Sequence, residues 1–209
     1  MEFSEVVRRR RMVRRYDPDR PVPPEAINKL LEYAIRAPSA GFSQGWGFLV
    51  LSSPAERAAY WQATTDDGVP DSWLAGMMTA PVLIIAHSNK GIYLDRYAEA
   101  DKGWTDRDES HWPVPYWDID TGFASMMMML GAVDEGLATC FFGVPVERME
   151  SYRAAFDVPV DYTPIGVISV GYRAPDIASP SLKRGRREID EVVHRGRWAG
   201  KTSGNGATI

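Results

Sequence analysis

Cysteine and long apolar runs are scarce in this chain of 209 residues, and each scarcity excludes a class of protein. Because Cys140 is the only cysteine, no intrachain disulfide can form, and a reducing cytoplasm is the expected compartment. The longest apolar run, residues 122–133, is too short to cross a bilayer. Residues 1–11 carry charge but lack the apolar stretch of a signal peptide. We therefore expect a cytoplasmic protein that does not act in a membrane.

Several catalytic signatures are absent as well. His87, His111 and His194 are scattered and show no metal-ligand spacing with acidic residues, so we expect no metal site. Ser39 lacks the surrounding Gly-x-Ser-x-Gly elbow of hydrolases. No Gly-x-Gly-x-x-Gly follows a strand, so a separate dinucleotide-binding fold is not expected.

Basic residues gather in two places, although the formal net charge is −4. Six arginines lie between residues 8 and 15, and four bases lie between residues 183 and 187, which together make ten of the 24 basic residues. The remaining chain is acidic, which argues against a general nucleic-acid surface. The two clusters suggest one compact anion that is bound from both ends of the chain. The alternatives are two solvated basic stretches, or a non-enzymatic interaction module that binds nucleic acid in a salt-dependent way.

The apolar pattern predicts helices that alternate with strands. Strands are expected at residues 48–51, 82–87, 138–142 and 165–170, and helices at 24–37, 54–63, 119–137 and 146–156. A short amphipathic segment at residues 3–10 precedes them. This alternation indicates an α/β or α+β sandwich in one domain over residues 1–198, closed by residues 188–198. Residues 199–209 are expected to be a disordered tail.

Two of these segments carry further expectations. Residues 119–137 form the strongest predicted helix, and its apolar residues occupy nearly all faces. A helix buried all round in so small a domain suggests cover from a second subunit. Residues 88–118 are long, polar and rich in aromatics, without clear periodicity, so we expect a lid or a functional excursion there.

Four motifs suggest ligand binding. In an extended segment Arg10 and Arg14 would point the same way and could hold a phosphate dianion. Residues 38–46 offer small residues for close backbone approach and polar groups on Ser39, Ser43 and Gln44. Phe141 and Phe142 could pack on one face of a flat ring, with a backbone N–H nearby. Residues 183–194 could close over the same phosphate. Taken singly, the second and third motifs also fit an ordinary loop and a core strand.

The ordered set of motifs resembles the nitroreductase superfamily. The resemblance rests on Arg-Arg-x-Val-Arg-x-Tyr-Asp at 10–17, Pro-Ser-Ala-Gly-x-Ser-Gln-x-Trp at 38–46, Gly-Leu followed by Gly143, and the basic run before Asp-Glu-Val-Val-His at 190–194. It covers residues 3–198. It implies an α+β three-layer sandwich with a central, mostly antiparallel sheet, flanked by helices, in an intertwined homodimer. FMN would lie at the subunit interface, bound by residues of both subunits.

The resemblance also implies roles for residues. Arg10, Arg11, Met12 and Arg14 would hold the phosphate and ribityl side of FMN. The partner subunit would contribute its copies of four loop residues: Pro38, Ser39, Ala40 and Phe42. Gln44 of the same loop is a further candidate for cofactor binding. Cys140, Phe141, Phe142 and Gly143 would line the ring, with an amide near Phe142 or Gly143 facing flavin N5. Arg184 and Arg186 are the residues chosen from the basic run, and Lys183 is the competing register.

Two departures from the family pattern stand out. Met12 occupies a position where many relatives have serine, so one hydrogen bond to the phosphate is missing. Several relatives also have a lysine before the second strand, near the pyrimidine end of the flavin. Residues 72–80 contain no basic residue, so another group must balance the negative charge of the reduced flavin.

The activity that the resemblance implies is hydride transfer from NADH or NADPH, through flavin N5, to a flat, electron-poor acceptor such as a nitroaromatic or a quinone. The order would be ping-pong, and the flavin would perform the chemistry, so no catalytic side chain is assigned. Candidate substrate contacts are Phe42, Tyr93, Tyr97, Trp104 and Trp112. Three alternatives stay open: a protein that sequesters FMN, reductive dehalogenation or flavin fragmentation on the same fold, and a deazaflavin as reductant.

Overall fold

The computed structural model describes residues 1–66, 68–176 and 179–198. The chain divides into two compact units, Met1–Asp176 and Ile177–Ile209, and each is described by itself. The single domain predicted over residues 1–198 stays a prediction. The tail predicted over 199–209 lies outside the described residues.

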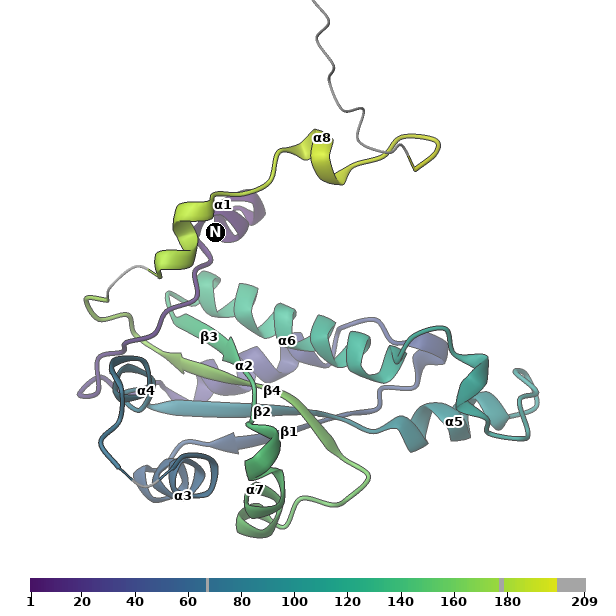
Figure 1. Cartoon of the computed structure of the whole chain (residues 1–209), viewed down its shortest axis with the longest axis horizontal. Coiled ribbons are helices and arrows are strands. Elements are labelled where there is room, and N and C mark those ends of the chain that lie inside the picture. The colour runs from purple at the N-terminus through teal and green to yellow at the C-terminus, as the bar shows by residue number, and fades with distance from the viewer. Residues whose placement is uncertain (67, 177–178, 199–209) are drawn as a thin grey trace, which may run out of the picture. The chain divides into compact units, whose positions relative to one another are not determined.

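A four-stranded antiparallel sheet forms the centre of the first unit (Figure 1). Its strands lie in the order β1-β2-β4-β3. Their bounds are β1 Trp46–Leu51, β2 Val82–Ser88, β3 Ala138–Phe142 and β4 Thr163–Gly171. The inner strand β2 is buried along its whole length, as its unbroken apolar run predicts. Strand β3 lies at one edge of the sheet, where its outer side is open to other segments.

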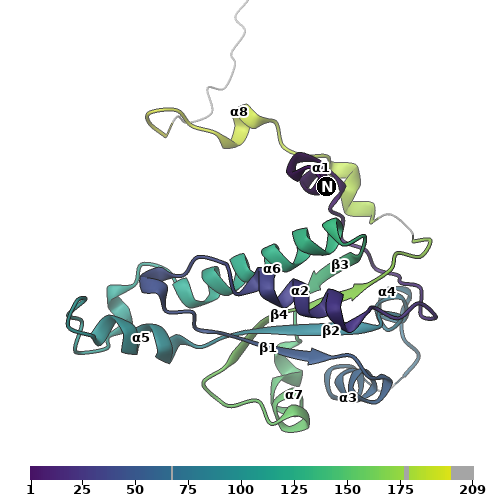
Figure 2. The same ribbon diagram turned by 180° about the vertical axis from the view of Figure 1, so that it is seen from behind.

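Helices cover both faces of this sheet (Figures 1 and 2). The upper layer in Figure 1 contains α2, Pro24–Ala34, and α6, Tyr116–Asp134. The lower layer contains α3, Pro54–Thr64, and α7, Met149–Phe156. Side chains of β2 alternate between the two cores: Val82 and Ile84 pack in the upper one, Leu83 and Ile85 in the lower one. The predicted α+β sandwich is confirmed.

Local signals in the sequence explain where several helices begin. Proline stands at the first positions of α2 and α3, where a missing N–H costs nothing. Helix α3 also has a capping box: Ser53 Oγ accepts from Glu56 N at 3.2 Å, and Glu56 Oε2 accepts from Ser53 N at 2.8 Å. The backbone N–H groups of Ser53 and Ser52, which both donate to Glu56 Oε2, lower the pKa of the Glu56 carboxyl.

The predicted elements differ from the structure in three places. A short helix, α4 (Ser72–Met77), was not predicted. The segment 88–118, predicted without periodic structure, contains α5 (Lys90–Ala98), and α6 begins at Tyr116 rather than at Ile119. The expectation that α6 is buried all round is wrong for a single protomer, because Phe123 and Met126 are 48% and 44% exposed. One side of α6 therefore presents apolar surface outward.

The remaining elements are short. Helix α1 spans Phe3–Arg9 and packs on α6 in the first unit. In the second unit, the described residues form a 3₁₀ turn at Pro180–Arg184 and helix α8 at Ile189–Val192. Among residues 1–66, 68–176 and 179–198, no helix combines the length and the apolar character that a membrane span requires.

Burial lowers the pKa of His87, which lies 4% exposed on β2 with Nε2 at 2.8 Å from Tyr152 Oη. The unfolded chain thus binds this proton more readily than the folded one. We expect the contribution of His87 to the free energy of unfolding to be complete above pH ~6.5. This contribution should decrease as the pH falls below that value. Urea unfolding at pH 7 and pH 5 should show a smaller pH dependence in His87→Gln than in wild type or in the control His111→Gln. If the free energy of unfolding depends on pH equally in all three proteins, His87 is not the source of that dependence.

Candidate functional site

The arginine-rich segment that follows α1 runs beside the edge strand β3. Met12 forms a parallel bridge with Thr139, and Val13 N donates to Thr139 O at 2.9 Å. Further along, Tyr16 pairs with Arg173 in the antiparallel sense, beside the end of β4. The segment is therefore extended, as its predicted role requires, and the end of the sheet fixes its backbone.

Buried hydrogen bonds of Tyr16 fix the position of this segment. Its ring is 1% exposed, its hydroxyl donates to Val13 O at 2.8 Å, and Ser169 Oγ lies 2.7 Å away. Gly76 of α4 allows a second close contact, since a Cβ there would lie 2.3 Å from Arg14 O. Together, these contacts hold the backbone of Arg14 against the body of the first unit.

The three arginines of the motif differ in what they contact. The Arg11 guanidinium donates to Arg8 O at 2.6 Å and to Arg10 O at 2.9 Å, so the segment itself satisfies it. Arg10 Nη1 is buried and has no hydrogen-bond partner among the described residues. Arg14 forms no ion pair within the described parts of the chain. A buried donor without an acceptor is costly, so Arg10 is suited to hold an oxyanion. Arg14, whose charge no described carboxylate pairs with, is suited to the same role.

The end of β3 lies next to this segment. Phe141 N donates to Met12 Sδ at 3.5 Å, which places the thioether on the outer edge of the strand. A Cβ added at Gly143 would meet nothing within 4 Å, so open space adjoins that backbone. Burial raises the pKa of the Cys140 thiol, which keeps it protonated and unreactive at neutral pH. Backbone groups, rather than the cysteine, are what this edge offers a ligand.

Phe141 and Phe142 do not share a face, which corrects the expectation that both could cover the same ring. Successive side chains of a strand point to opposite sides of the sheet. Phe141 packs with the upper core and lies against Gly166, where a Cβ would come within 2.1 Å of its ring. Phe142 packs with the lower core and stacks on Trp61, with ring centroids 5.9 Å apart.

The loop between α2 and β1 has a tightly specified backbone. Phe42 and Gln44 adopt positive φ angles of 56° and 53°, which are unfavourable for residues other than glycine, and Gly41 has φ 61°. Ser39 Oγ accepts from Gln44 N at 3.0 Å, and Ser43 Oγ donates to Ala40 O at 2.6 Å. The outcome is that Phe42 is 74% exposed, in a conformation that the loop itself maintains.

Residues of helices α5 and α6 bind this loop through hydrogen bonds and packing contacts. Asp120, 3% exposed near the start of α6, accepts from Ala40 N and from Tyr93 Oη, each at 2.8 Å. Arg96 Nε donates to Gly41 O at 2.9 Å. The ring of Tyr97 lies so close to Gly41 that a Cβ there would come within 2.6 Å. The loop is thus clamped between the predicted lid and the first turns of α6.

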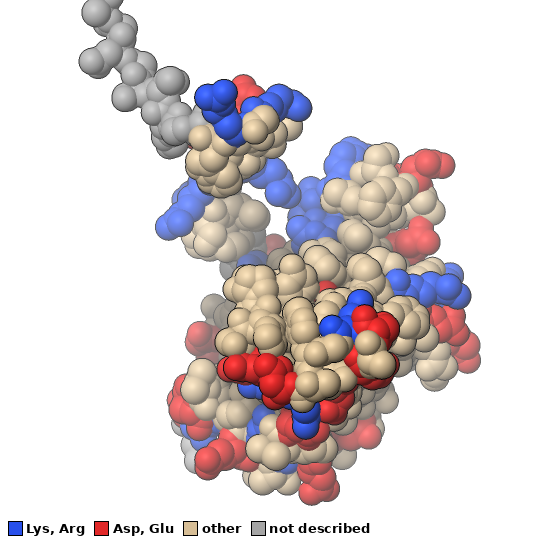
Figure 3. All heavy atoms as spheres, turned by 90° about the vertical axis from the view of Figure 1, so that its right-hand side faces the viewer, with Lys and Arg blue, Asp and Glu red and all other residues tan. Residues whose placement is uncertain are grey.

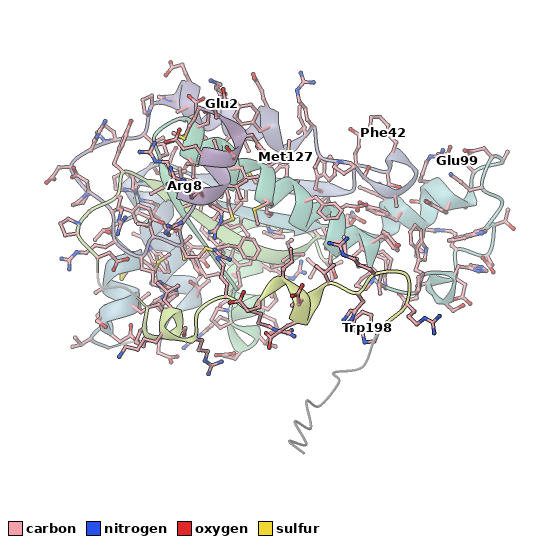
Figure 4. The ribbon with its side chains drawn as sticks, turned by 90° about the horizontal axis from the view of Figure 1, so that it is seen from above. Glu2, Arg8, Phe42, Glu99, Met127 and Trp198 are labelled. Atoms are coloured by element: carbon pink, nitrogen blue, oxygen red, sulfur yellow. The ribbon has the colours of Figure 1, made fainter. Side chains whose placement is uncertain are left out.

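Within the first unit of one protomer, the predicted cofactor residues form two separate groups. The arginine segment and the end of β3 form one group, and the loop 38–45 forms the other. The loop is tied to Asp120, whereas α1 reaches Asp134, where the Met1 amino group binds the carboxylate at 2.6 Å. A rise of about 1.5 Å per residue puts those two positions on α6 about 21 Å apart. In Figure 4, Phe42 lies toward Glu99, while Glu2 and Arg8 lie beyond Met127 at the opposite end.

The predicted substrate residues of the lid pack against one another. Trp112 is central, with ring centroids 4.4 Å from Tyr97, 5.4 Å from Trp104 and 6.0 Å from Tyr93. Tyr93 is fully buried, so the structure places it beneath the lid rather than on its surface. Tyr97 and Phe42 belong to one neighbourhood, because Tyr97 packs on the loop that presents Phe42.

Ion pairs fasten the outside of the lid. Arg96 binds both carboxylate oxygens of Asp101, at 2.7 and 2.8 Å, and Arg107 Nη2 lies 2.8 Å from Asp95 Oδ1. The guanidinium of Arg96 holds the pKa of Asp101 below its usual value. Figure 3, which faces the α5 end of the first unit, shows acidic and basic side chains next to one another there. Because both signs alternate, this end does not present a surface of a single charge.

In the second unit, the basic run is exposed throughout. Lys183, Arg184 and Arg186 have no ion-pair partner among the described residues of the chain, whereas Arg187 Nε lies 3.3 Å from Glu191 Oε2. The part assigned to Arg184 and Arg186, with Lys183 as competitor, stays a prediction. The same holds for the other site residues as ligands of a cofactor.

Sequence reasoning missed two residues that shape these groups, and it named Tyr16 only as a motif residue without its partner Ser169. Asp120 is a buried polar residue whose partners come from distant segments, so no local pattern identifies it. Trp61 lies on α3. The capping box of α3 predicts where this helix begins, but it does not predict that the Trp61 ring packs on Phe142. No group of three or more His, Cys, Asp or Glu in the described ranges has metal-binding geometry.

Comparisons with known proteins agree on one family. The profile of the Nitroreductase family matches residues 7–172. A candidate NADH dehydrogenase/NAD(P)H nitroreductase of Methanothermobacter thermautotrophicus is 29% identical over 204 residues, covering 95% of this chain and 88% of that protein. A nitroreductase family protein of Clostridium difficile 630 has a similar structure, with a TM-score of 0.71, 25% identity, and coverage of 95% of this chain and 100% of that one.

A third protein was solved with a cofactor. It is a candidate nitroreductase of Exiguobacterium sibiricum 255-15 in complex with FMN, with a TM-score of 0.64, 23% identity, and coverage of 90% of this chain and 98% of that one. The chain thus has the nitroreductase fold and belongs to the nitroreductase family.

Proposed function

We propose that this protein is an FMN-dependent NAD(P)H oxidoreductase that works as a homodimer with FMN at the subunit interface. The observation that carries the proposal is the division of the predicted cofactor residues into two groups near opposite ends of α6. In one protomer, the arginines and the open edge of β3 lie near one end of α6, whereas the loop 38–45 lies near the other end. A second copy is the simplest way to bring such a loop to the arginines.

The residues of this chain fit the chemistry of FMN. Arg10 and Arg14 provide guanidinium groups without ion-pair partners in the described ranges, beside an extended backbone. Gly143 leaves open space next to the edge of β3, where a flat ring can approach the amides. The relative from Exiguobacterium sibiricum supports this choice of cofactor, as its structure contains FMN. FMN, when bound, supplies hydride acceptance and donation at N5.

The rest of the activity follows the ping-pong scheme that the resemblance implies. NADH or NADPH would be the reductant, and a flat, electron-poor compound such as a nitroaromatic or quinone would be the acceptor. The names of relatives as NAD(P)H nitroreductases support this class. The protein's own part is to bind, orient and shield the reacting rings. Burial raises the pKa of the Cys140 thiol, which disfavours the nucleophilic thiolate.

The exposed apolar side of α6 supports the homodimer. Phe123 and Met126 project from α6, and Phe3 and Val7 project from the neighbouring α1, 70% and 50% exposed. Apolar side chains that recur on adjacent helices gain stability when a second apolar surface covers them. For Arg184 and Arg186, binding of the FMN phosphate stays a prediction.

The absorbance spectrum and the solution mass of the purified protein test this proposal. We expect flavin bands, one FMN per chain, and the mass of a dimer by size-exclusion chromatography with light scattering. A colourless monomer that takes up no flavin when FMN is supplied contradicts the proposal. That result would favour the alternative that the basic clusters belong to a non-enzymatic interaction module.

A further inference from the structure

The stretch of residues 172–176, which follows β4, pairs with the arginine-rich segment. Arg15 O accepts a backbone hydrogen bond from this stretch at 3.1 Å, and Asp17 N donates one to it at 2.9 Å. At its end, Oδ2 of Asp176 accepts from Arg14 N at 3.1 Å. A carboxylate thus binds the main chain of one of the two arginines that are proposed to hold the FMN phosphate.

Contacts on two sides fix the backbone of Arg14. Its N–H is bound by Asp176, and its C=O lies so close to Gly76 that a Cβ there would come within 2.3 Å. The first of these contacts is a hydrogen bond to a charged acceptor, which is stronger than one between neutral groups. Because the backbone of a residue determines which side-chain rotamers are allowed, these contacts also limit where the Arg14 guanidinium can lie.

The carboxylate of Asp176 does not neutralise this guanidinium. Asp176 forms no ion pair within the described parts of the chain. Both charged groups nevertheless act on the Cys140 thiol: burial is the main cause of its raised pKa, Arg14 lowers that pKa, and Asp176 raises it. The two side chains therefore lie near the same part of β3, with the carboxylate bound to the backbone and the guanidinium available to an external anion.

Asp176 has two opposing effects on the binding of a phosphate. Its negative charge repels a phosphate dianion, and salt screens this repulsion. Its hydrogen bond to Arg14 N favours phosphate binding because it holds the arginine in place, and salt weakens a short, partly buried contact much less. Asparagine at this position keeps an acceptor oxygen without the charge, and alanine keeps neither, so the two effects can be measured separately.

We propose that Asp176 is a positioning residue for the FMN phosphate, which acts through Arg14 by holding its backbone where the guanidinium can bind the phosphate. The inference rests on the proposed function, in which Arg14 binds that phosphate. If Asp176 only ended the pairing of residues 172–176, its substitution would change the stability of the chain and would not depend on Arg14 in its effect on FMN affinity. Coupling between the two residues in FMN binding therefore distinguishes the two roles.

Fluorescence titration of the full-length apoprotein with FMN at ~1 M NaCl tests this role, because the Debye length falls to ~3 Å at that salt concentration. We expect Asp176→Ala to weaken FMN binding about threefold to tenfold, the effect of one hydrogen bond, and Asp176→Asn to bind within about twofold of wild type. In an Arg14→Ala background, Asp176→Ala should have almost no further effect. Asp19→Ala removes an exposed carboxylate just beyond the segment, so it is the matched control and should leave the affinity unchanged.

A second readout needs no flavin. Hydrogen exchange of the Arg14 amide, followed by NMR in the apoprotein, should be faster in Asp176→Ala than in wild type and close to wild type in Asp176→Asn. If wild type binds FMN but Asp176→Ala binds it equally well, or weakens binding just as much in the Arg14→Ala background, the positioning role is wrong. A wild-type protein that takes up no FMN instead overturns the proposed function, and with it this role of Asp176.

Discussion

Replacing Arg10 or Arg14 with alanine is expected to weaken FMN binding by about 1–3 kcal/mol, on the order of fivefold to 150-fold, as for other charge-assisted hydrogen bonds. Arg10 Nη1 lacks a partner in the structure, and Arg14 has no ion pair within the described residues. Neither substitution breaks a contact that holds the fold, so stability should change little. Fluorescence titration of the apoprotein with FMN measures the effect.

Two further variants make this test specific. Arg11 already donates to the carbonyls of Arg8 and Arg10, so Arg11→Ala should weaken FMN binding less than the other two substitutions. Arg36, exposed after α2, is a matched arginine outside the cluster, and Arg36→Ala should have no effect. Wild-type FMN affinity in both Arg10→Ala and Arg14→Ala contradicts the phosphate assignment.

Replacing Asp120 with alanine is expected to lower the free energy of unfolding by about 2–5 kcal/mol, because it leaves Tyr93 Oη and Ala40 N buried without an acceptor. The loop that presents Phe42 should lose its fixed conformation, so FMN binding should fall as well. Urea unfolding and FMN titration measure the two effects separately. Asp120→Asn keeps one oxygen and should show a smaller loss in both.

A paired variant and a distant one control for this substitution. Tyr93→Phe removes one of the two donors, so Asp120→Asn should cost less in the Tyr93→Phe background than in wild type. Asp134→Ala changes an exposed carboxylate at the other end of α6 and should affect unfolding by less than about 1 kcal/mol. Reduced stability of Asp120→Ala with unchanged FMN affinity contradicts the link between the loop and the cofactor.

The strands were predictable because their signal is local. Val82–Ala86 is an unbroken apolar run, and in the structure β2 is an inner strand buried on both faces. Helix α5 was not predicted because its buried side consists of aromatic residues rather than of aliphatic residues at helical spacing. Tyr93 is buried, and Tyr97 packs on Gly41. Its start did carry a signal, since Asn89 caps it by accepting from Ile92 N at 3.3 Å.

The candidate site was predictable only in part, for a related reason. Motifs identified the arginine segment and the loop 38–45, because unusual residue types stand close together in the sequence. What holds them in place comes from far away: Ser169 for Tyr16, and Asp120 for Ala40. Contacts of this kind leave no periodic trace in the sequence.

The most direct test of the account is an anaerobic titration of the purified protein with NADH and, separately, with NADPH, followed by absorbance. We expect flavin bands that bleach with at least one of the two nicotinamides and recover when 4-nitrobenzyl alcohol or a quinone is added. Each oxidised nicotinamide should correspond to one two-electron reduction of the acceptor. A bound flavin that neither nicotinamide reduces would contradict an NAD(P)H oxidoreductase and indicate that the protein binds FMN without this turnover.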